Sequence, residues 1–333
     1  MAFVIKTAVA GIVAVVAIGI AAWVYLDRWA ERPGPDAAPI RIEVAAGASL
    51  KRIGRDLEDA GAIDSSFLFT WLARREGVAE LIRVGEYEVP TTTPADLLTR
   101  LVSGDVITYR VKFIEGWTVA QVLEALRQSP ALTLTLDGAS GDDVLARLGL
   151  GESHAEGQFF PDTYQYERGQ TDGDILVRAY VAMRAELAAS WSARAVGLPY
   201  ETPNEALIMA SIIEKETGLG SDRNKISGVF VRRLQRGIRL QTDPSVIYGL
   251  GAAFDGNLTR AHLDRDGPYN TYTRRGLPPS PICLPGRESI NAALHPEEGA
   301  ALYFVARGDG TSQFSETLQE HLAAVRRYQL GRN

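Results

Sequence analysis

Residues 202–217 read TPNEALIMASIIEKET, and this stretch has the pattern of a helix buried in the core of a domain. Thr202 can cap the helix, Pro203 suits its first position, and Glu205 completes a capping box. Gly218 is a suitable residue to end it. On a helical wheel the apolar residues between these ends point in almost every direction, which is typical of a helix surrounded by other elements. We therefore predict a core helix here.

The last turn of this helix carries a carboxyl group beside apolar residues. Glu214 projects next to Leu207 and Ala210, whereas Glu216 lies about 160° away around the helix. The two carboxyl groups therefore cannot converge on one substrate atom. Burial without a nearby cation favours the protonated form of a carboxyl group, which is the form that a general acid needs. Glu214 is thus a candidate general acid; the alternative is that it ends the helix in solvent, neutralised by Lys215 or an arginine.

Four segments around the helix are rich in turn, amide, hydroxyl and aromatic residues. They read EGQFFPDTY (156–164), RLQTDPSVIYG (239–249), PYNTY (268–272) and GLPPSPICLPG (276–286). Aromatic faces stack on sugar rings, and amide and carboxylate groups bind sugar hydroxyls, so such loops suit a carbohydrate groove. The alternative is that their prolines and tyrosines pack the loops against the core.

The first thirty residues contain a segment long enough to span a membrane. Residues 7–26 form an uncharged run of 20 residues between Lys6 and Asp27, and a helix of that length crosses a hydrocarbon core of about 30 Å. A cleaved signal peptide is the alternative, but its apolar part is normally shorter and precedes a small-x-small site. We expect a retained single-pass anchor, with residues 1–6 inside and the bulk of the chain outside.

The remaining chain divides by composition into four segments. Residues 27–39 contain ERPGPDAAP and predict a short, stiff linker. Residues 40–105 have the order strand, helix, helix, strand, which resembles a LysM module, a small fold that binds N-acetylated sugars. Residues 106–154 repeat the strand–turn–helix pattern and then form a connection. Residues 155–333 form a larger α+β domain, so we predict an α+β chain behind one transmembrane helix.

Charge and residue types exclude several classes of function. The 333 residues include 35 Lys and Arg against 41 Asp and Glu, and the net charge of −6 disfavours nucleic-acid binding. The four histidines lie far apart, and the one cysteine, Cys283, allows no internal disulfide or CxxC metal site. No SxxK, SDN and KTG set and no GxSxG motif is present. We expect no metal and no organic cofactor.

Five ordered motifs resemble those of the membrane-anchored endolytic murein transglycosylase family (MltG, YceG-like). They are EGQFFPDTY, ASIIEKET, RLQTDPSVIYG, YNTY and GLPPSPICLPG, and the resemblance covers residues 155–333. The anchor and the LysM-like region fit the layout of the family. The resemblance implies that Glu214, the first glutamate of EKET, is the catalytic residue.

The resemblance also implies the reaction, the location and the partners. Glu214 would protonate the glycosidic oxygen of the MurNAc–GlcNAc β-1,4 bond in nascent strands and then deprotonate the MurNAc C6 hydroxyl, which closes a 1,6-anhydro ring. One carboxyl group then suffices, whereas ordinary glycosidases use two. The implied location is the bacterial inner membrane with the bulk in the periplasm, and the implied partners are peptidoglycan strands and glycan-polymerising penicillin-binding proteins.

Further polar residues of the motifs are candidates for glycan contact or for orienting Glu214. They are Gln241, Asp243, Tyr248, Asn270 and Tyr272, whereas Asp162 is either a neighbour of the site or a turn former. Two rival hypotheses remain. A non-catalytic scaffold would bind glycan and recruit synthases, and a hydrolase would release reducing MurNAc ends and need a second carboxylate, with Asp243 as the first candidate.

Overall fold

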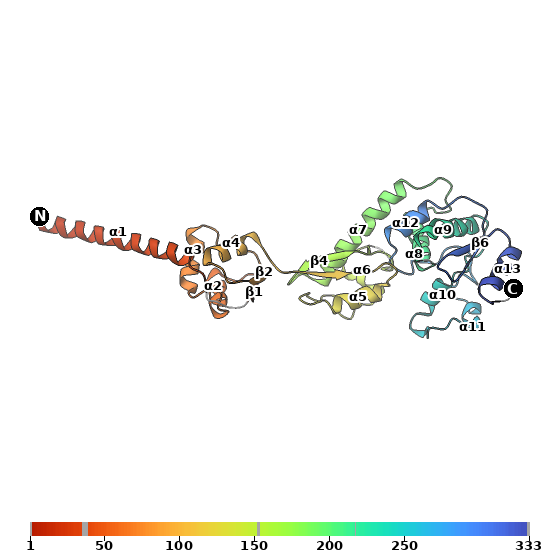
Figure 1. Cartoon of the computed structure of the whole chain (residues 1–333), viewed down its shortest axis with the longest axis horizontal. Coiled ribbons are helices and arrows are strands. Elements are labelled where there is room, and N and C mark those ends of the chain that lie inside the picture. Colours follow the sequence, from red (N-terminus) through yellow and green to blue (C-terminus); the bar gives the residue numbers. More distant parts are fainter. Residues whose placement is uncertain (1, 35–38, 152–153, 217, 332–333) are drawn as a thin grey trace. The chain divides into compact units, whose positions relative to one another are not determined.

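The computed structural model describes residues 2–34, 39–151, 154–216 and 218–331 of the chain (Figure 1). The chain divides into two compact units. The N-terminal unit comprises Met1–Tyr109 and Tyr166–Gly169, and the C-terminal unit comprises Arg110–Gln165 and Gln170–Asn333. Residues 110–154 thus belong with the C-terminal unit, whereas the sequence placed them outside the domain that begins at residue 155.

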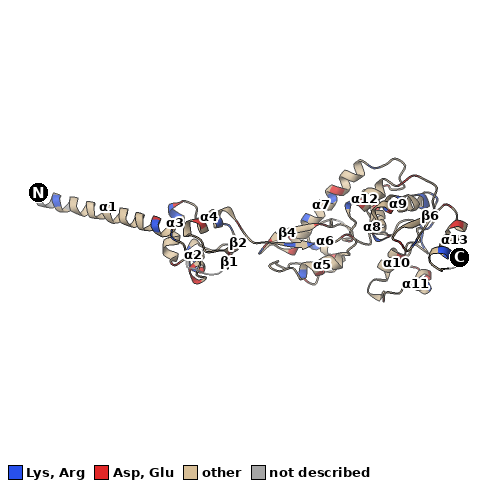
Figure 2. Cartoon of the chain, viewed as in Figure 1, with Lys and Arg blue, Asp and Glu red and all other residues tan. Residues whose placement is uncertain are grey.

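The N-terminal helix α1 (Ala2–Ala30) is longer than the predicted membrane segment. In the described part of the chain it alone is long and apolar enough to cross a membrane, with a mean hydropathy of 2.5 over the most apolar 18 residues of the range Ile5–Ala30. Its middle carries no charged residue (Figure 2). The sequence predicted a linker from residue 27, but the helix continues because Trp29 and Ala30 are buried in the core of the N-terminal unit. Residues 35–38 of the predicted linker lie outside the described residues.

The N-terminal unit has the predicted order of strand, helix, helix and strand. Strand β1 (Ile40–Val44) pairs antiparallel with β2 (Gly85–Val89), with Ile40 opposite Val89. Helices α2 (Leu50–Asp59) and α3 (Ser66–Arg75) lie between the strands in the chain, and α4 (Pro94–Ser103) follows them. The helices begin at hydroxyl caps, since Ser49, Ser65 and Thr93 each accept a hydrogen bond from a backbone N–H three residues on. The relation to LysM stays a prediction.

The C-terminal unit surrounds the predicted core helix. Helix α8 (Pro203–Glu216) starts and ends within a residue or so of the prediction, and its residues 206–213 are all buried. It packs against α12 (Arg287–Leu294), α9 (Gly220–Gln235), α7 (Asp172–Ser192) and α10 (Asp243–Leu250). Thr217, the end of the predicted helix, lies outside the described residues.

Smaller elements complete the mixed α+β fold. Strand β3 (Thr108–Lys112) forms a two-stranded sheet with β4 (Thr163–Glu167), and β5 (Tyr303–Ala306) pairs antiparallel with β6 (Ser312–Ser315). The remaining helices are α5 (Val119–Arg127), α6 (Gly141–Arg147), the 3₁₀ turn η1 (Gly251–Ala253), α11 (Arg260–Asp264) and α13 (Leu318–Tyr328).

Candidate functional site

Glu214 lies in the last turn of α8, with 6% of its side chain exposed. Its Oε2 accepts a hydrogen bond of 2.9 Å from the backbone N–H of Gly286. Its Oε1 lies 3.7 Å from Nη2 of Arg223 on α9. The carboxyl group is therefore held inside the unit and not in solvent, and a cation, the Arg223 guanidinium, lies near it. Arg223 can stabilise the carboxylate that forms when Glu214 gives up a proton.

The GLPPSPICLPG segment is fastened to α8, and this brings Gly286 to Glu214. Ser211 Oγ accepts a bond of 3.0 Å from the N–H of Ile282, and Cys283 Sγ donates to the Ser211 carbonyl at 3.2 Å. Burial raises the pKa of the Cys283 thiol well above its usual value, which disfavours the thiolate that a nucleophile needs. The bonds of Ile282 and Cys283 to Ser211 thus position the backbone of this segment beside the candidate acid.

A second chain segment closes the other side of Gly286. The turn after β3 contains Glu115, Gly116 and Trp117, and it is paired with the same loop: Gly116 N–H donates to Leu284 O at 2.8 Å, and Leu284 N–H donates to Trp117 O at 2.7 Å. Partial burial and the neighbouring Glu214 carboxylate raise the pKa of Glu115. The sequence predicted only a strand–turn–helix repeat here and gave no role to Glu115. The one feature that could have drawn attention to Glu115 is its position in a Glu-Gly turn just before the helix cap Thr118.

Arg223 joins two carboxylates at this site. Besides Glu214 it contacts Oε2 of Glu288, which lies in the first turn of α12 and has 72% of its side chain exposed. Its buried Nε has no hydrogen-bond partner among the described residues. The site is therefore a guanidinium between two carboxylates, with a third carboxylate, that of Glu115, next to it. The sequence did not indicate that Arg223 and Glu288 belong to this site. Arg223 lies near the start of α9 and Glu288 near the start of α12, and only the fold brings these two helix starts together.

Glu216 faces a different segment, as its helical position predicted. Its Oε1 accepts a hydrogen bond from Thr242 Oγ1. Burial, with a smaller contribution from the Asp243 charge, raises the pKa of Glu216 to about 7. Tyr272 in turn donates to Asp243 Oδ1 at 2.5 Å. Two of the candidate glycan contacts, Asp243 and Tyr272, are thus bonded to each other next to Glu216.

Gln241 and Asn270, two further candidates for glycan contact, differ in their exposure to solvent. Gln241 has a φ of 55°, an unusual backbone conformation for a residue other than glycine, and it is exposed. Asn270 is buried, and its amide nitrogen donates to the carbonyls of His262 and Leu263 in α11 and of Arg265 just after that helix. Its oxygen accepts from the N–H groups of the two residues that follow Thr271. Its geometry is that of a loop-forming residue.

Tyr248 and Asp162 are also engaged within the chain. The Tyr248 hydroxyl donates to Glu156 Oε2 at 3.1 Å, and the Val119 N–H donates to Glu156 Oε1 at 3.0 Å. Burial raises the pKa of Glu156 to about 7. Asp162 is exposed, and its Oδ1 accepts from the N–H of the next residue, Thr163, at 2.6 Å; its role stays a prediction.

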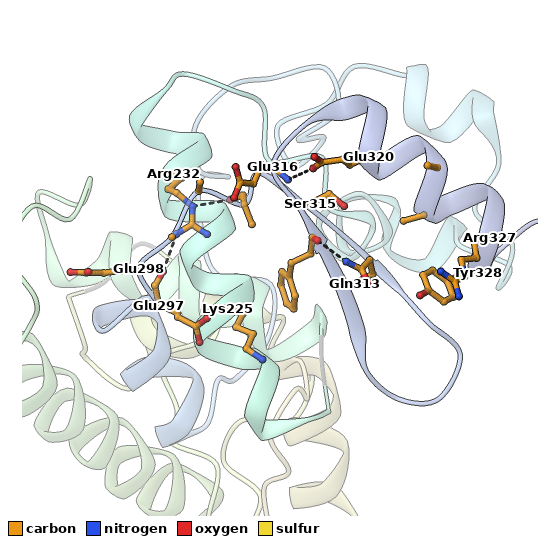
Figure 3. Close-up of a pocket in the computed structure, with 16 residues that line it drawn as sticks. Lys225, Arg232, Glu297, Glu298, Gln313, Ser315, Glu316, Glu320, Arg327 and Tyr328 are labelled. Carbon is orange, nitrogen blue, oxygen red and sulfur yellow. Dashed lines mark hydrogen bonds between the residues drawn. The ribbon is translucent and has the colours of Figure 1, made fainter.

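A large cavity of the unit lies elsewhere. It has a volume of about 790 Å³ and lies between α9, the β5–β6 hairpin and α13 (Figure 3). Its lining includes Lys225, Arg232, Glu297, Glu320 and Tyr328, but not Glu214. Cavity size alone would therefore misplace the site.

Comparison with known proteins agrees with the motifs. A curated endolytic murein transglycosylase of Bacillus subtilis is 28% identical over 312 residues, which are 88% of this chain and 86% of that protein. Proteins of the same name from two Streptococcus pneumoniae strains are 26% identical over 85% of this chain, which spans 57% of their length. The crystal structure of a putative YceG-like protein from Listeria monocytogenes aligns with a TM-score of 0.53 and 29% identity, over 85% of this chain and 98% of that one.

The family model described as YceG-like matches residues 42–327, a range that includes the N-terminal unit behind α1 and every residue placed around Glu214. Because this match covers most of the chain, the protein belongs to the YceG-like family.

Proposed function

We propose that the chain is an endolytic lytic transglycosylase that cleaves the MurNAc–GlcNAc β-1,4 bond of peptidoglycan, with Glu214 as its general acid and base. The observation that carries this proposal is the setting of Glu214: a largely buried carboxyl group, bonded to the Gly286 amide and close to Arg223. The curated relatives that bear the transglycosylase name support the choice of substrate.

The reaction follows from a single carboxyl group of this kind. Protonated Glu214 gives its proton to the glycosidic oxygen, and the bond between that oxygen and C1 of MurNAc breaks. The C6 hydroxyl of the same MurNAc attacks C1, and the Glu214 carboxylate takes its proton. The products are a 1,6-anhydroMurNAc end and a free GlcNAc 4-hydroxyl, and Glu214 is protonated again.

Each neighbour of Glu214 has a role in this cycle. The Gly286 N–H fixes one carboxylate oxygen and so leaves the carboxyl group in one orientation. The Arg223 guanidinium balances the charge of Glu214 after its proton has left. Arg223 is itself held by Glu288, so its position does not depend on bound glycan.

The arrangement at the membrane is part of the proposal. In it, α1 is a single-pass anchor, residues 1–6 are cytoplasmic, and both compact units are periplasmic. The LysM-like N-terminal unit would contact glycan, and glycan-polymerising penicillin-binding proteins would supply nascent strands. A non-catalytic scaffold is the alternative, and it requires that Glu214 be dispensable.

Mass spectrometry of products from uncrosslinked glycan strands tests the proposal. The full chain in detergent is compared with Glu214→Gln and with Glu205→Gln, a matched change at the opposite end of α8. We expect internal fragments with 1,6-anhydroMurNAc ends from the wild type and Glu205→Gln, and none from Glu214→Gln. Reducing MurNAc ends would make the protein a hydrolase, and cleavage that survives Glu214→Gln would exclude Glu214 as the acid.

A further inference from the structure

A cavity of about 530 Å³ lies in the N-terminal unit where helix α1 ends. Its walls come from the end of α1, the second half of α3 and α4, three helices that contact one another (Figure 1). Leu72 and Leu98 line the cavity and are buried, and the partly exposed apolar residues of the lining are Val78, Ala95 and Val102. The cavity is therefore largely apolar, and no step of the proposed reaction uses it.

The position of the cavity along α1 places it at the end of the membrane segment. The uncharged run ends at Leu26, and Asp27, Ala30 and Glu31 line the cavity. The N–H of Glu31 still donates to the Asp27 carbonyl, so the helical rise of about 6 Å applies between these two residues. The headgroup layer on each side of a bilayer is about 5–7 Å thick. In the proposed anchoring, the part of α1 that lines the cavity therefore lies at the level of the lipid headgroups.

A contact between α3 and α1 brings α3 to the same level. Arg75, in the last turn of α3, forms an ion pair with Asp27, and its guanidinium carbon lies 5.0 Å from the centre of the Trp23 ring. Trp23 belongs to the uncharged run and is exposed, as expected of an indole at a membrane interface. An arginine that reaches back to the apolar run while its charge is paired suits the boundary between headgroups and acyl chains. In the proposed anchoring, this end of α3 thus also lies against lipid.

The charges around the cavity are mostly negative. The charged residues that line it in the described part of the chain are Asp27, Glu31 and Glu76, together with Arg75. Asp27 and Glu76 both pair with Arg75, and each keeps about half of its side chain exposed. Glu31 is exposed as well. The lining therefore favours a lipid headgroup that carries an ammonium group over one whose only charge is its phosphate.

We propose that this cavity binds one membrane phospholipid with an ammonium headgroup. An acyl chain packs against the apolar walls, and the ammonium group lies among the exposed carboxylates. The occupant is a lipid because the helix that lines the cavity continues into the bilayer, where lipid is the abundant molecule at this level. The proposal rests on the anchoring by α1, which is part of the proposed function, and not on the reaction at Glu214.

Native mass spectrometry of the full chain tests the proposal. The chain is reconstituted in nanodiscs with equal amounts of phosphatidylethanolamine, which carries an ammonium group, and phosphatidylglycerol, which does not. It is then released into a mild detergent. We expect the wild type to retain one lipid molecule, chiefly phosphatidylethanolamine. A wild type that retains no lipid, or that retains a second copy of the chain in place of lipid, would overturn the proposal.

Filling the cavity should remove the lipid. Ala95→Phe places a ring in the lining, and the lipid-bound fraction should fall by about tenfold or more. Thr99→Trp fills the same space from an exposed position of α4, so it spares the core. Ala79→Phe is the matched control, because the described residues that line its cavity of about 430 Å³ include none of α1. Unchanged retention in both filling variants, or an equal loss in the control, would overturn the proposal.

The acidic lining predicts which headgroup is retained. Glu31→Lys should lower the ratio of bound phosphatidylethanolamine to bound phosphatidylglycerol by about twofold to fivefold, the effect of one exposed ion pair. Glu58→Lys, at an exposed position of α2 outside the lining, should leave the ratio in place. Equal retention of the two lipids by the wild type would overturn the headgroup assignment.

Glycan cleavage by the same samples separates this proposal from the proposed function. If the wild type retains lipid but makes no anhydro ends, the proposed reaction fails and the lipid site stands. If it makes anhydro ends and stays in the nanodiscs but retains no lipid, the reaction and the anchoring stand and the lipid site is refuted. A wild type that does not stay in the nanodiscs would refute the anchoring and the lipid site together.

Discussion

Glu216 makes the stability of the C-terminal unit depend on pH. Burial raises its pKa from 4.5 to about 7 in the folded chain, with Asp243 adding to the effect. Between these pH values the folded state keeps a proton that the unfolded state has released, so the folded state loses stability as the pH rises. The rise from 4.5 to about 7 is equivalent to about 3 kcal/mol of unfolding free energy, all of it lost above about pH 7.

Glu216→Gln removes this dependence and keeps the local contact. A glutamine cannot ionise, but its amide oxygen can still accept the hydrogen bond from Thr242. The variant should therefore gain up to about 3 kcal/mol over the wild type between pH 5 and pH 8. Glu156, whose pKa burial also raises to about 7, contributes equally to both proteins and cancels in the comparison.

Urea unfolding of the full chain in detergent, at pH 5, 6, 7 and 8, provides the measurement. Hydrogen exchange of the α8 amides identifies the transition that belongs to the C-terminal unit. Glu205→Gln, in the first turn of the same helix, is the control and should follow the wild type, because a glutamine oxygen can still accept the bonds from the N–H groups of Glu201 and Thr202. A constant difference between Glu216→Gln and wild type at pH 5 and pH 8 would refute the reasoning, since it would mean that Glu216 is ionised in the folded state throughout.

Two further substitutions test the fold on which the site depends. Trp29→Ala should destabilise the N-terminal unit by about 3–5 kcal/mol, because a buried indole is removed; Trp29→Phe keeps packing but loses the bond to Asp64 and should cost about 1 kcal/mol. Equal unfolding curves for wild type and Trp29→Ala would contradict the burial. Asn270→Ala should lower the unfolding temperature, because three carbonyls at the C-terminal end of α11 lose their donor. An unchanged unfolding temperature with weaker glycan binding would instead return Asn270 to the glycan-binding residues.

The core helix and its glutamates could be predicted because their signals are local. The cap at Thr202 and the apolar residues around α8 lie within one short stretch, and helical geometry fixes the angle between Glu214 and Glu216. The order of strands and helices after α1 could also be predicted, because hydroxyl caps such as Ser49 mark where helices begin.

The surroundings of Glu214 could not be predicted because they come together only in the fold. Arg223 lies on the next helix, and Glu115 is about a hundred positions earlier in the chain. Glycine usually signals a positive φ or a turn, and the space beside Gly286 is set by a side chain from another segment. Asn270 shows another limit of the sequence: an amide in a loop looks available, but in the fold its nitrogen donates to the end of α11 and its oxygen accepts from Tyr272 N–H, and its contact with glycan stays a prediction.

The burial of Trp29 joins helix α1 rigidly to the N-terminal unit. Helix α1 enters the core of the N-terminal unit without a break, so that unit cannot swivel on a flexible tether. Leu26, the last residue of the predicted membrane segment, is itself buried in that core, so no linker separates the segment from the unit. In the proposed anchoring, the N-terminal unit therefore stands at a fixed height against the lipid surface. Any change in bilayer thickness that tilts α1 would tilt the unit with it.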